Sequence, residues 1–402
     1  MAGSDGIGVG MVGYSFMGAV HSQAWRSVHR FFDVPLIPRT TVLAGRDVTK
    51  TTAAAERMGW DSVETDWRAL IARDDVGIVD ICTPGDTHAE IALAALAAGK
   101  HVICEKPLAN TVPEAEEMAR AAAEAATKGV RSMVAFNYRR VPALALAKKM
   151  IAEGRLGKIR HVRAVYLQDW LSDENAPLAW RLRKEKAGSG ALGDIGAHII
   201  DATQFITGQT ISGVSALTET FVPRRPLPVE AAGGLTAGTV DGSKPVEYGD
   251  VTVDDAALFL ARFSGGAVAT FEATRFATGR KNAMRLEVNG SAGSLSFDFE
   301  SMNELWFHDE TLDPAEGGFR RIVVTEPTHP YLGAWWPPGH GLGYEHTFTH
   351  EVADFLTDIG TGVDPSPSFA DGAQVQRVLH AVERSAADSA RWTPITEPEG
   401  DA

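Results

Sequence analysis

The stretch IGVGMVGYSFMGAVHSQAW, from Ile7 to Trp25, decides the fold of the first part of the chain. It begins with an apolar run typical of a buried strand and continues into a pattern typical of an amphipathic helix. A short turn that contains glycine joins the two segments. A strand that passes through such a turn into a helix is typical of dinucleotide-binding units, because the helix N-terminus attracts the pyrophosphate.

The complete spacing G-x-G-x-x-G at Gly8, Gly10 and Gly13 overlaps a second spacing, which starts at Gly13 and has serine in its middle place. The first two glycines lie inside the strand run. Gly13 stands where the strand should end, and Gly18 stands where helix and strand must pack closely. The second spacing therefore fits better, although an ordinary strand-to-helix turn has the same pattern. The predicted cofactor-binding residues of this turn are Gly13, Tyr14, Ser15, Phe16 and Met17.

Short apolar runs alternate with helix-like stretches up to about residue 140. The further strand-like runs TTVLAG, VGIVDICTP, HVICEKP and RSMVAFNYR are separated by segments of helical pattern. This alternation predicts a doubly wound parallel sheet. We therefore expect an α/β protein with a Rossmann domain over residues 1–140.

The pattern changes after about residue 140. Runs such as AALFLARFSGGAVATFEATRF alternate apolar and polar residues around turn signals, and so predict antiparallel hairpins. We expect an α+β domain over 141–402 with a large, mostly antiparallel open sheet. Residues 223–250 and 326–346, rich in Pro and Gly, are expected to form loops outside it. An amphipathic helix at about 369–390 is expected to pack back on the first domain.

The composition argues against several classes of protein. With 38 Lys and Arg against 52 Asp and Glu, the net charge of −14 disfavours a nucleic-acid or anionic-membrane surface. Cys82 and Cys104 lie in apolar runs, which fits buried, reduced thiols in a cytoplasm. No signal-peptide pattern is visible, and no apolar stretch approaches the length of a membrane span. We expect a soluble, cytoplasmic protein without nucleic-acid or membrane partners.

The end of the second predicted strand bears on the choice of coenzyme. Gly45 stands where an NAD-preferring fold often places Asp or Glu, and Arg46 follows it. A guanidinium in place of a carboxylate suits a 2′-phosphate, which favours NADP(H) slightly. Asp47 could turn inward and reverse this preference, and Arg46 could equally be a solvated loop residue. The cofactor prediction is therefore NAD(H) or NADP(H).

Two charged residues follow a buried strand in VICEKPLAN, residues 102–110. Glu105 and Lys106 stand at the carboxyl end of the strand, where doubly wound sheets bind their ligands. Packing does not explain charges directly after the three apolar residues 102–104. A lysine there could hydrogen-bond a substrate oxygen, whereas the alternative is a surface turn with an ion pair.

The segment GDIGAHIID, residues 193–201, places Asp194, His198 and Asp201 at spacings that share one helix face. A histidine beside a carboxylate is a candidate general base, because its pKa lies near neutrality. The alternatives are a core histidine and the beginning of a metal site. No other ligand cluster is visible in the sequence, so we predict no metal.

These motifs together resemble the Gfo/Idh/MocA oxidoreductases, in the family's order from about residue 7 to 390. The resemblance includes His21 after the glycine turn, Thr83-Pro84 with His88, and Pro107 after Lys106. It implies a Rossmann domain followed by a domain with a large open sheet. The exposed face of that sheet commonly makes the oligomer interface, so we expect a homodimer or homotetramer. Members oxidise or reduce a hydroxyl carbon of a sugar, inositol or similar polyol with NAD or NADP.

Within the family, AFNYRR (135–140), YLQDW (166–170) and AWR (179–181) resemble a branch that oxidises anhydrosugars such as levoglucosan at carbon 3 with NAD. The resemblance implies catalytic roles for Lys106, Asp194 and His198. Those residues would bind substrate together with Tyr138 and Gln168. The further residues implied at the cofactor are Gly45, Arg46, Thr83, Pro84, His88, Glu105, Trp180 and Arg181. Ser15 and Gly45 depart from the branch's pattern, where glycine and an acidic residue are expected.

The expected reaction is reversible hydride transfer between the nicotinamide and a secondary alcohol carbon. His198, held by Asp194, would take the hydroxyl proton, and Lys106 would stabilise the developing alkoxide. Trp335, Trp336 and Tyr344 could cover a sugar ring or make subunit contacts. One alternative is a relative that keeps its cofactor bound and oxidises a glycoside transiently, for bond cleavage or transhydrogenation. A nucleotide-sensing regulator without turnover is disfavoured, because the three catalytic residue types are all present.

Overall fold

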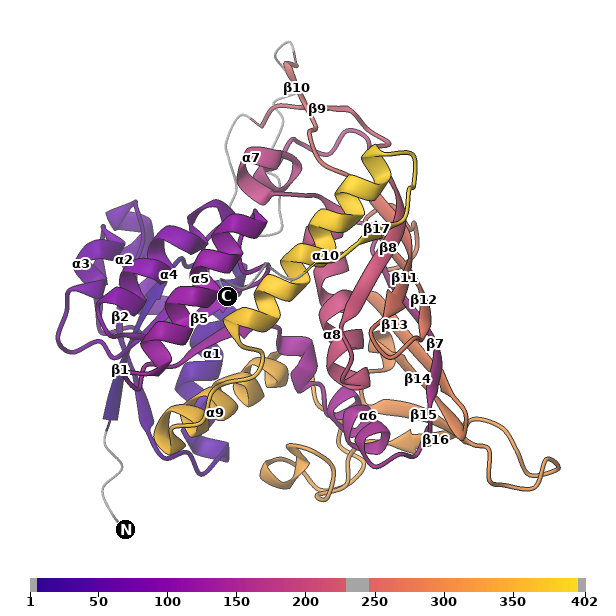
Figure 1. Cartoon of the computed structure of the whole chain (residues 1–402). Helices are drawn as coiled ribbons and strands as arrows, with labels where there is room; N and C mark the ends of the chain where they lie inside the picture. The colour runs from indigo at the N-terminus through magenta and orange to yellow at the C-terminus, as the bar shows by residue number, and fades with distance from the viewer. Residues whose placement is uncertain (1–5, 229–245, 397–402) are drawn as a thin grey trace. The chain divides into compact units, whose positions relative to one another are not determined.

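The computed structural model describes residues 6–228 and 246–396 (Figure 1). They form two compact units. The first comprises residues 6–137 and 343–373, and the second comprises residues 138–228, 246–342 and 374–396. Within these residues, no helix has the length and apolar character that crossing a membrane requires.

The first unit is built on a six-stranded sheet of order β3-β2-β1-β4-β5-β6, and every neighbouring pair is parallel. The strands are β1 (Gly6–Val12), β2 (Ile37–Ala44), β3 (Ser62–Glu64), β4 (Ile78–Ile81), β5 (His101–Glu105) and β6 (Ser132–Ala135). The helices are α1 (Phe16–Phe31), α2 (Val48–Met58), α3 (Trp67–Ile71), α4 (His88–Ala97), α5 (Val112–Ala126) and α9 (Tyr344–Thr361). The strand order reverses between β1 and β4, and ligands of such sheets bind beside that point at the carboxyl ends of the strands. The predicted doubly wound sheet is confirmed.

Helix α9 shows how a distant part of the chain completes the first unit. The expected division near residue 140 assigned all of 141–402 to the second domain and left 326–346 as a loop. The structure begins α9 at Tyr344 and packs it with α1, where Phe348 and Phe355 join a core that contains Trp25. An amphipathic pattern shows that one face must be buried, but it does not show which neighbour buries it.

The second unit is built on a nine-stranded sheet of order β16-β15-β14-β13-β7-β12-β11-β8-β17. Its strands are β7 (Ile159–Leu167), β8 (Ile211–Glu219), β11 (Ala256–Phe263), β12 (Val268–Thr274), β13 (Ala283–Gly290), β14 (Gly293–Asp298), β15 (Glu304–Asp309), β16 (Arg320–Val323) and β17 (Thr393–Pro394). The pair of β7 and β12 is parallel and the other neighbours are antiparallel. The expected mostly antiparallel sheet is therefore confirmed.

Helices of the second unit lie along one face of this sheet (Figure 1). They are α6 (Pro142–Ala152), α8 (Ala197–Thr207) and most of α10 (Phe369–Ala387), with the short α7 (Lys184–Ala187) near one end. The expected loop at 223–250 contains a two-stranded ribbon of β9 (Arg224–Pro226) and β10 (Tyr248–Asp250). The rest of that stretch, residues 229–245, lies outside the described residues.

Candidate active site

The predicted phosphate turn lies between β1 and α1, as the sequence indicates. Strand β1 ends at Val12, and α1 begins at Phe16 with Ser15 as its N-cap. Gly13 has φ +100°, and a Cβ there would lie 2.7 Å from the carbonyl oxygen of Cys82. Both the turn and the close approach therefore require glycine at this position. The first N–H groups of α1 have no partner within the helix, which makes this end suited to a pyrophosphate.

The end of β2 explains Gly45 sterically. A Cβ on Gly45 would meet the ring of Tyr14 and would lie 2.6 Å from the hydroxyl of Thr51. Arg46 is solvent-exposed. Asp47 is the N-cap of α2, and its carboxylate accepts a hydrogen bond from the Lys50 N–H at 3.0 Å. The Tyr14 ring thus gives a steric reason for the absence of an acidic side chain at position 45.

The turn that carries Lys106 is anchored by Glu105, the last residue of β5. The Glu105 side chain is 6 % exposed. Its Oε1 lies 3.0 Å from Nε2 of His21, and its Oε2 accepts a hydrogen bond from the Lys106 N–H at 3.1 Å. The same carboxylate therefore joins helix α1 to the backbone of Lys106.

His88 holds the other side of this turn. Its Nδ1 lies 3.0 Å from the Pro107 carbonyl oxygen, and its Nε2 lies 2.9 Å from the Thr83 carbonyl oxygen. His88 is 1 % exposed and is the first residue of α4. It ties the segment after β4 to the segment after β5, so the predicted cofactor residues Thr83, Glu105 and His88 belong to one connected framework.

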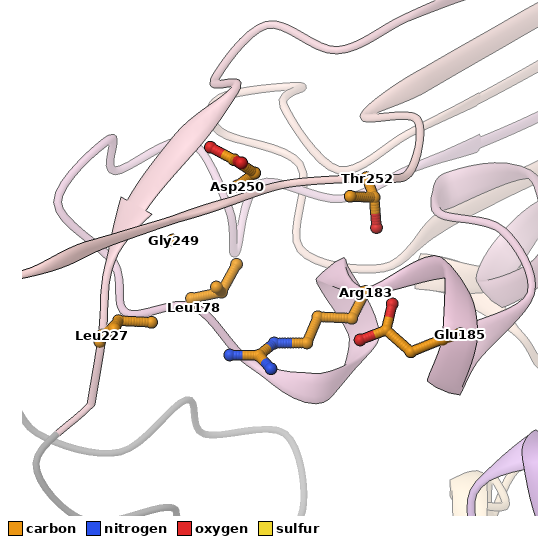
Figure 2. Close-up of a pocket in the computed structure, with 7 residues that line it drawn as sticks. All are labelled: Leu178, Arg183, Glu185, Leu227, Gly249, Asp250 and Thr252. Atoms are coloured by element: carbon orange, nitrogen blue, oxygen red, sulfur yellow. The ribbon is translucent and has the colours of Figure 1, made fainter.

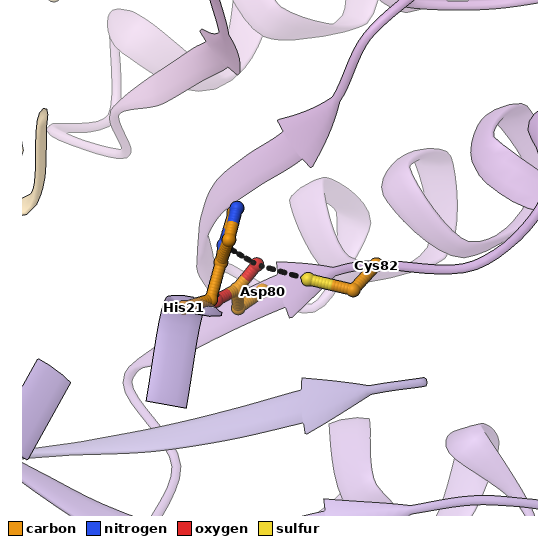
Figure 3. A group of neighbouring side chains, drawn as sticks. All are labelled: His21, Asp80 and Cys82. Carbon is orange, nitrogen blue, oxygen red and sulfur yellow. Dashed lines mark hydrogen bonds and ion pairs between the residues drawn. The ribbon is translucent and has the colours of Figure 1, made fainter. Parts of the chain in front are cut away.

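His21, Asp80 and Cys82 form a polar cluster that the sequence did not indicate as a group (Figure 3), and His21 also contacts Glu105. Nδ1 of His21 lies 3.1 Å and 3.0 Å from the Asp80 oxygens. The indole N–H of Trp25 donates to Asp80 at 2.7 Å, and the thiol of Cys82 donates at 3.3 Å. Burial is the largest single influence and lowers the pKa of His21, but the charge and hydrogen bond of Asp80 together with the contributions of Cys82 outweigh it, and the net shift is well upward. The available signal was Asp80 itself, a carboxylate within the apolar run VGIVDICTP.

His21, Asp80 and Cys82 could also be considered as metal ligands, because one donor atom of each lies within 4.8 Å of the others. Each of these donors already serves in a hydrogen bond within the cluster. Burial also raises the pKa of the Cys82 thiol, which disfavours the thiolate that a metal prefers. We therefore interpret the cluster as a hydrogen-bond network.

In the second unit, Asp194 and His198 lie at the start of α8. Asp194 belongs to a π-helical turn, Leu192–Gly196, a kind of irregularity that is frequent at functional sites. Its carboxylate lies 3.6 Å from the guanidinium of Arg275, which is fully buried. Asp201 is 1 % exposed and pairs with Arg139 at 2.6 Å, so it belongs to a separate ion pair.

The ring of Tyr138 stacks on His198, with centroids 4.4 Å apart and an interplanar angle of 27°. The Tyr138 hydroxyl lies 2.6 Å from that of Tyr166, which donates to Asn282 Oδ1 at 2.7 Å. The amide of Gln168 donates to the same oxygen at 2.8 Å. The structure thus connects the predicted residues Tyr138 and Gln168, and it adds Tyr166 and Asn282. Asn282 had no signal in the sequence, because it lies more than 100 residues from its partners.

Other predicted residues lie elsewhere in the two units. The Arg181 guanidinium stacks over the Trp180 ring at 4.5 Å in the second unit. Trp335 and Trp336 are neighbours there, with ring centroids 5.9 Å apart. Tyr344 instead begins α9 of the first unit, where it stacks on Phe16 with centroids 6.3 Å apart. Tyr344 therefore has a packing role within its own unit.

The second unit also contains a hollow beside the ribbon of β9 and β10 (Figure 2). None of the predicted site residues lines it. Its lining residues are Leu178, Arg183, Glu185, Leu227, Gly249, Asp250 and Thr252.

Comparison with known proteins gives the same family for both units. Residues 7–136 match the oxidoreductase family with an NAD-binding Rossmann fold, and residues 144–296 match the GFO/IDH/MocA C-terminal domain. The chain belongs to the Gfo/Idh/MocA oxidoreductases. This Gfo/Idh/MocA protein is accordingly an NAD(P)-dependent dehydrogenase.

Several relatives match this Gfo/Idh/MocA chain over nearly its full length. Levoglucosan dehydrogenase of Pseudarthrobacter phenanthrenivorans is 44 % identical over 393 residues, which cover 97 % of this chain and 98 % of that protein. A solved oxidoreductase domain protein from Kribbella flavida has a TM-score of 0.92 and 63 % identity, covering 98 % of this chain and 100 % of the other. A structure of levoglucosan dehydrogenase in complex with NADH and levoglucosan has a TM-score of 0.90 and 42 % identity, with the same coverage.

Proposed function

We propose that this enzyme transfers a hydride reversibly between a nicotinamide cofactor and a secondary alcohol carbon of a sugar, glycoside or anhydrosugar. The proposed position is carbon 3 of a compound such as levoglucosan. The observation that carries the proposal is the polar chain of Tyr138, Tyr166, Asn282 and Gln168 beside the His198 ring. Hydroxyls and amides in series suit a ligand with several hydroxyls. The extensive similarity to a levoglucosan dehydrogenase supports the same substrate class.

The proposed roles follow from the chemistry of the side chains. A nicotinamide cofactor held at the turn from Gly13 to Phe16 would serve as the hydride acceptor or donor. His198 removes the proton of the substrate hydroxyl, and the stacked Tyr138 ring fixes the orientation of the imidazole. Lys106 stabilises negative charge on the same oxygen as it develops. Asp194 assists His198, and Arg275 holds the Asp194 carboxylate.

We propose NAD(H) as the cofactor. The lean toward NADP(H) rested on Gly45 and Arg46, and the Tyr14 ring supplies another reason for Gly45. Relatives solved with NADH support NAD(H) as well. The ratio of kcat/KM for NAD to that for NADP tests this choice, and we expect a ratio above one. A ratio below one would return the preference to NADP.

One screen tests the proposed reaction. Sugars, glycosides and anhydrosugars including levoglucosan are incubated with NAD and NADP in parallel, and the absorbance of the reduced nicotinamide is followed. Steady accumulation of reduced cofactor supports the proposal. Conversion of a glycoside without accumulation indicates a cofactor that is recycled in place. Cofactor binding without turnover of any polyol would instead favour a nucleotide-sensing regulator.

We further propose that the chain forms a homodimer or homotetramer through the sheet of the second unit. Leu217, Leu258 and Leu260 are 62 %, 46 % and 57 % exposed. Leu258 pairs with Leu217 across β11 and β8, so these side chains share one face. Contiguous exposed apolar side chains are typical of an interface between proteins.

A cytoplasmic location remains our proposal, based on the free, largely buried thiols Cys82 and Cys104.

A further inference from the structure

We propose that His21 and Asp80 are positioning residues, which act through Glu105 to fix the turn that carries Lys106. This inference rests on the proposed role of Lys106 in the reaction. His21 comes from α1, Asp80 from β4, and Glu105 from the end of β5. The cluster therefore connects one helix and two strands of the Rossmann unit to one backbone turn.

The charges of the cluster follow from its geometry. Nδ1 of His21 faces Asp80 at 3.0 Å, and Nε2 faces Glu105 at 3.0 Å. In the imidazolium form both ring nitrogens donate, one to each carboxyl group, and the neighbours of His21 raise its pKa in favour of that form. The three side chains are 1 %, 0 % and 6 % exposed, so this cation and its two anions are held out of water.

Such a buried group of charges needs an explanation beyond stability. Well-packed apolar residues of similar size are often as stable as a buried ion pair, because they avoid the cost of desolvation. The second oxygen of Glu105 supplies the explanation, because it accepts the N–H of Lys106 at 3.1 Å. A carboxylate that accepts a hydrogen bond from one ring nitrogen fixes the orientation of the imidazole.

Asp80 is itself held from several sides, which makes it a firm support. Trp25 donates to Asp80 at 2.7 Å and Cys82 at 3.3 Å, in addition to His21. Asp80 thus orients His21, and His21 orients Glu105. Removal of His21 leaves the Glu105 carboxylate without the imidazole that holds it, so the turn at Lys106 loses its anchor.

The opposite end of β5 offers a matched control. His101, the first residue of β5, accepts a hydrogen bond at Nδ1 from the Arg131 N–H at 2.9 Å. Lys100 precedes it and donates to the carbonyl oxygens of Arg73 and Val76 at 2.9 Å and 2.8 Å. His101 and Lys100 therefore provide a hydrogen-bonded histidine and a nearby lysine at the end of β5 that is away from Lys106.

The first experiment needs no substrate. The full-length wild type, His21→Asn and His101→Asn proteins are acetylated with a limiting reagent, and the labelling of Lys106 and Lys100 is followed by mass spectrometry. We expect His21→Asn to change the labelling rate of Lys106 severalfold, because the turn that carries Lys106 is no longer held in place, and to leave Lys100 unchanged. His101→Asn should leave Lys106 unchanged. Unchanged labelling of Lys106 in His21→Asn, or an equal change at both lysines, would overturn the inference.

The second experiment separates positioning from a general structural role. His21→Asn should lower kcat by roughly 10- to 100-fold, the scale that a misplacement of about 1 Å costs, with little change in the Kd for the cofactor. In a Lys106→Ala background the same substitution should lower the rate no further. A full additional loss in that background would contradict action through Lys106. Asp80→Asn, which keeps the shape of the side chain, replaces His21→Asn if the latter does not fold.

The two proposals fail in different ways. If the wild type turns over no sugar with either coenzyme, the proposed function fails, but the labelling of Lys106 still decides the inference about His21. If turnover is normal and His21→Asn changes neither labelling nor kcat, the inference fails alone.

Discussion

At the scale of single residues, the role of a charged side chain in this protein depends on the groups that it contacts. Glu105 and Lys106 are neighbours in sequence, yet their side chains have different partners in the proposed chemistry. Glu105 is buried against His21 and anchors the backbone, whereas Lys106 is proposed to meet the substrate. The sequence predicted both positions correctly at the end of a strand but did not separate these tasks.

Lys106→Ala should remove most of the turnover. Loss of one donor to a developing oxyanion costs about 100- to 1000-fold in kcat, because the charge then forms without its preorganised partner. Cofactor affinity should remain close to that of the wild type, which titration of protein fluorescence measures. Turnover near the wild-type level would contradict the assignment of Lys106.

The buried imidazolium should give the stability a characteristic dependence on pH. The pKa of His21 in the folded chain is raised above its usual value of about 6.5. Its contribution is therefore complete below the unfolded pKa and is lost as the pH rises through the folded pKa. Urea unfolding should show a larger difference in the free energy of unfolding between the wild type and His21→Gln at pH 6 than at alkaline pH. A difference that is independent of pH would argue against a protonated His21.

At the scale of elements, the start of α8 and the ends of β7 and β13 assemble the proposed substrate surface. Strand β7 supplies Tyr166, and Asn282 directly precedes β13. The two strands pair antiparallel, which brings Tyr166 opposite Met284 and Asn282 close to Gln168. Strand register thus completes a polar chain that helix periodicity alone could not predict.

Asn282→Ala should weaken substrate binding in particular. The substitution leaves the Tyr166 hydroxyl and the Gln168 amide without their shared acceptor. Lost hydrogen bonds of this kind cost about 1–3 kcal/mol, which corresponds to a KM for the sugar raised by about 5- to 150-fold. Steady-state kinetics with varied sugar measure this effect, and the KM for the nicotinamide is the control. An equal rise in both KM values would indicate a general disturbance.

At the scale of the whole molecule, two sheets of different design share one chain. The parallel sheet is covered by helices, whereas the open sheet carries exposed leucines on β8 and β11. This contrast supports the proposal that a second copy covers the leucines.

Leu260→Lys should lower the oligomeric state. Leu260 is 57 % exposed within one chain, so a lysine is tolerated there if the face is free and is costly if the face is covered. Light scattering coupled to size-exclusion chromatography should show a smaller species, while the circular dichroism spectrum stays unchanged. A species of unchanged size would contradict the proposed interface, and so would a monomeric wild type.

The sequence by itself determined the Rossmann unit, the strand–turn–helix at Gly13 and the strand-end position of Lys106. Those features depend on local periodicity and on residues close together in the chain. Tertiary structure alone decided that α9 joins the first unit, that Asn282 joins Tyr166, and that His21 lies between Asp80 and Glu105. In each of these cases the partners are far apart in sequence, and burial away from water selects which polar groups must meet.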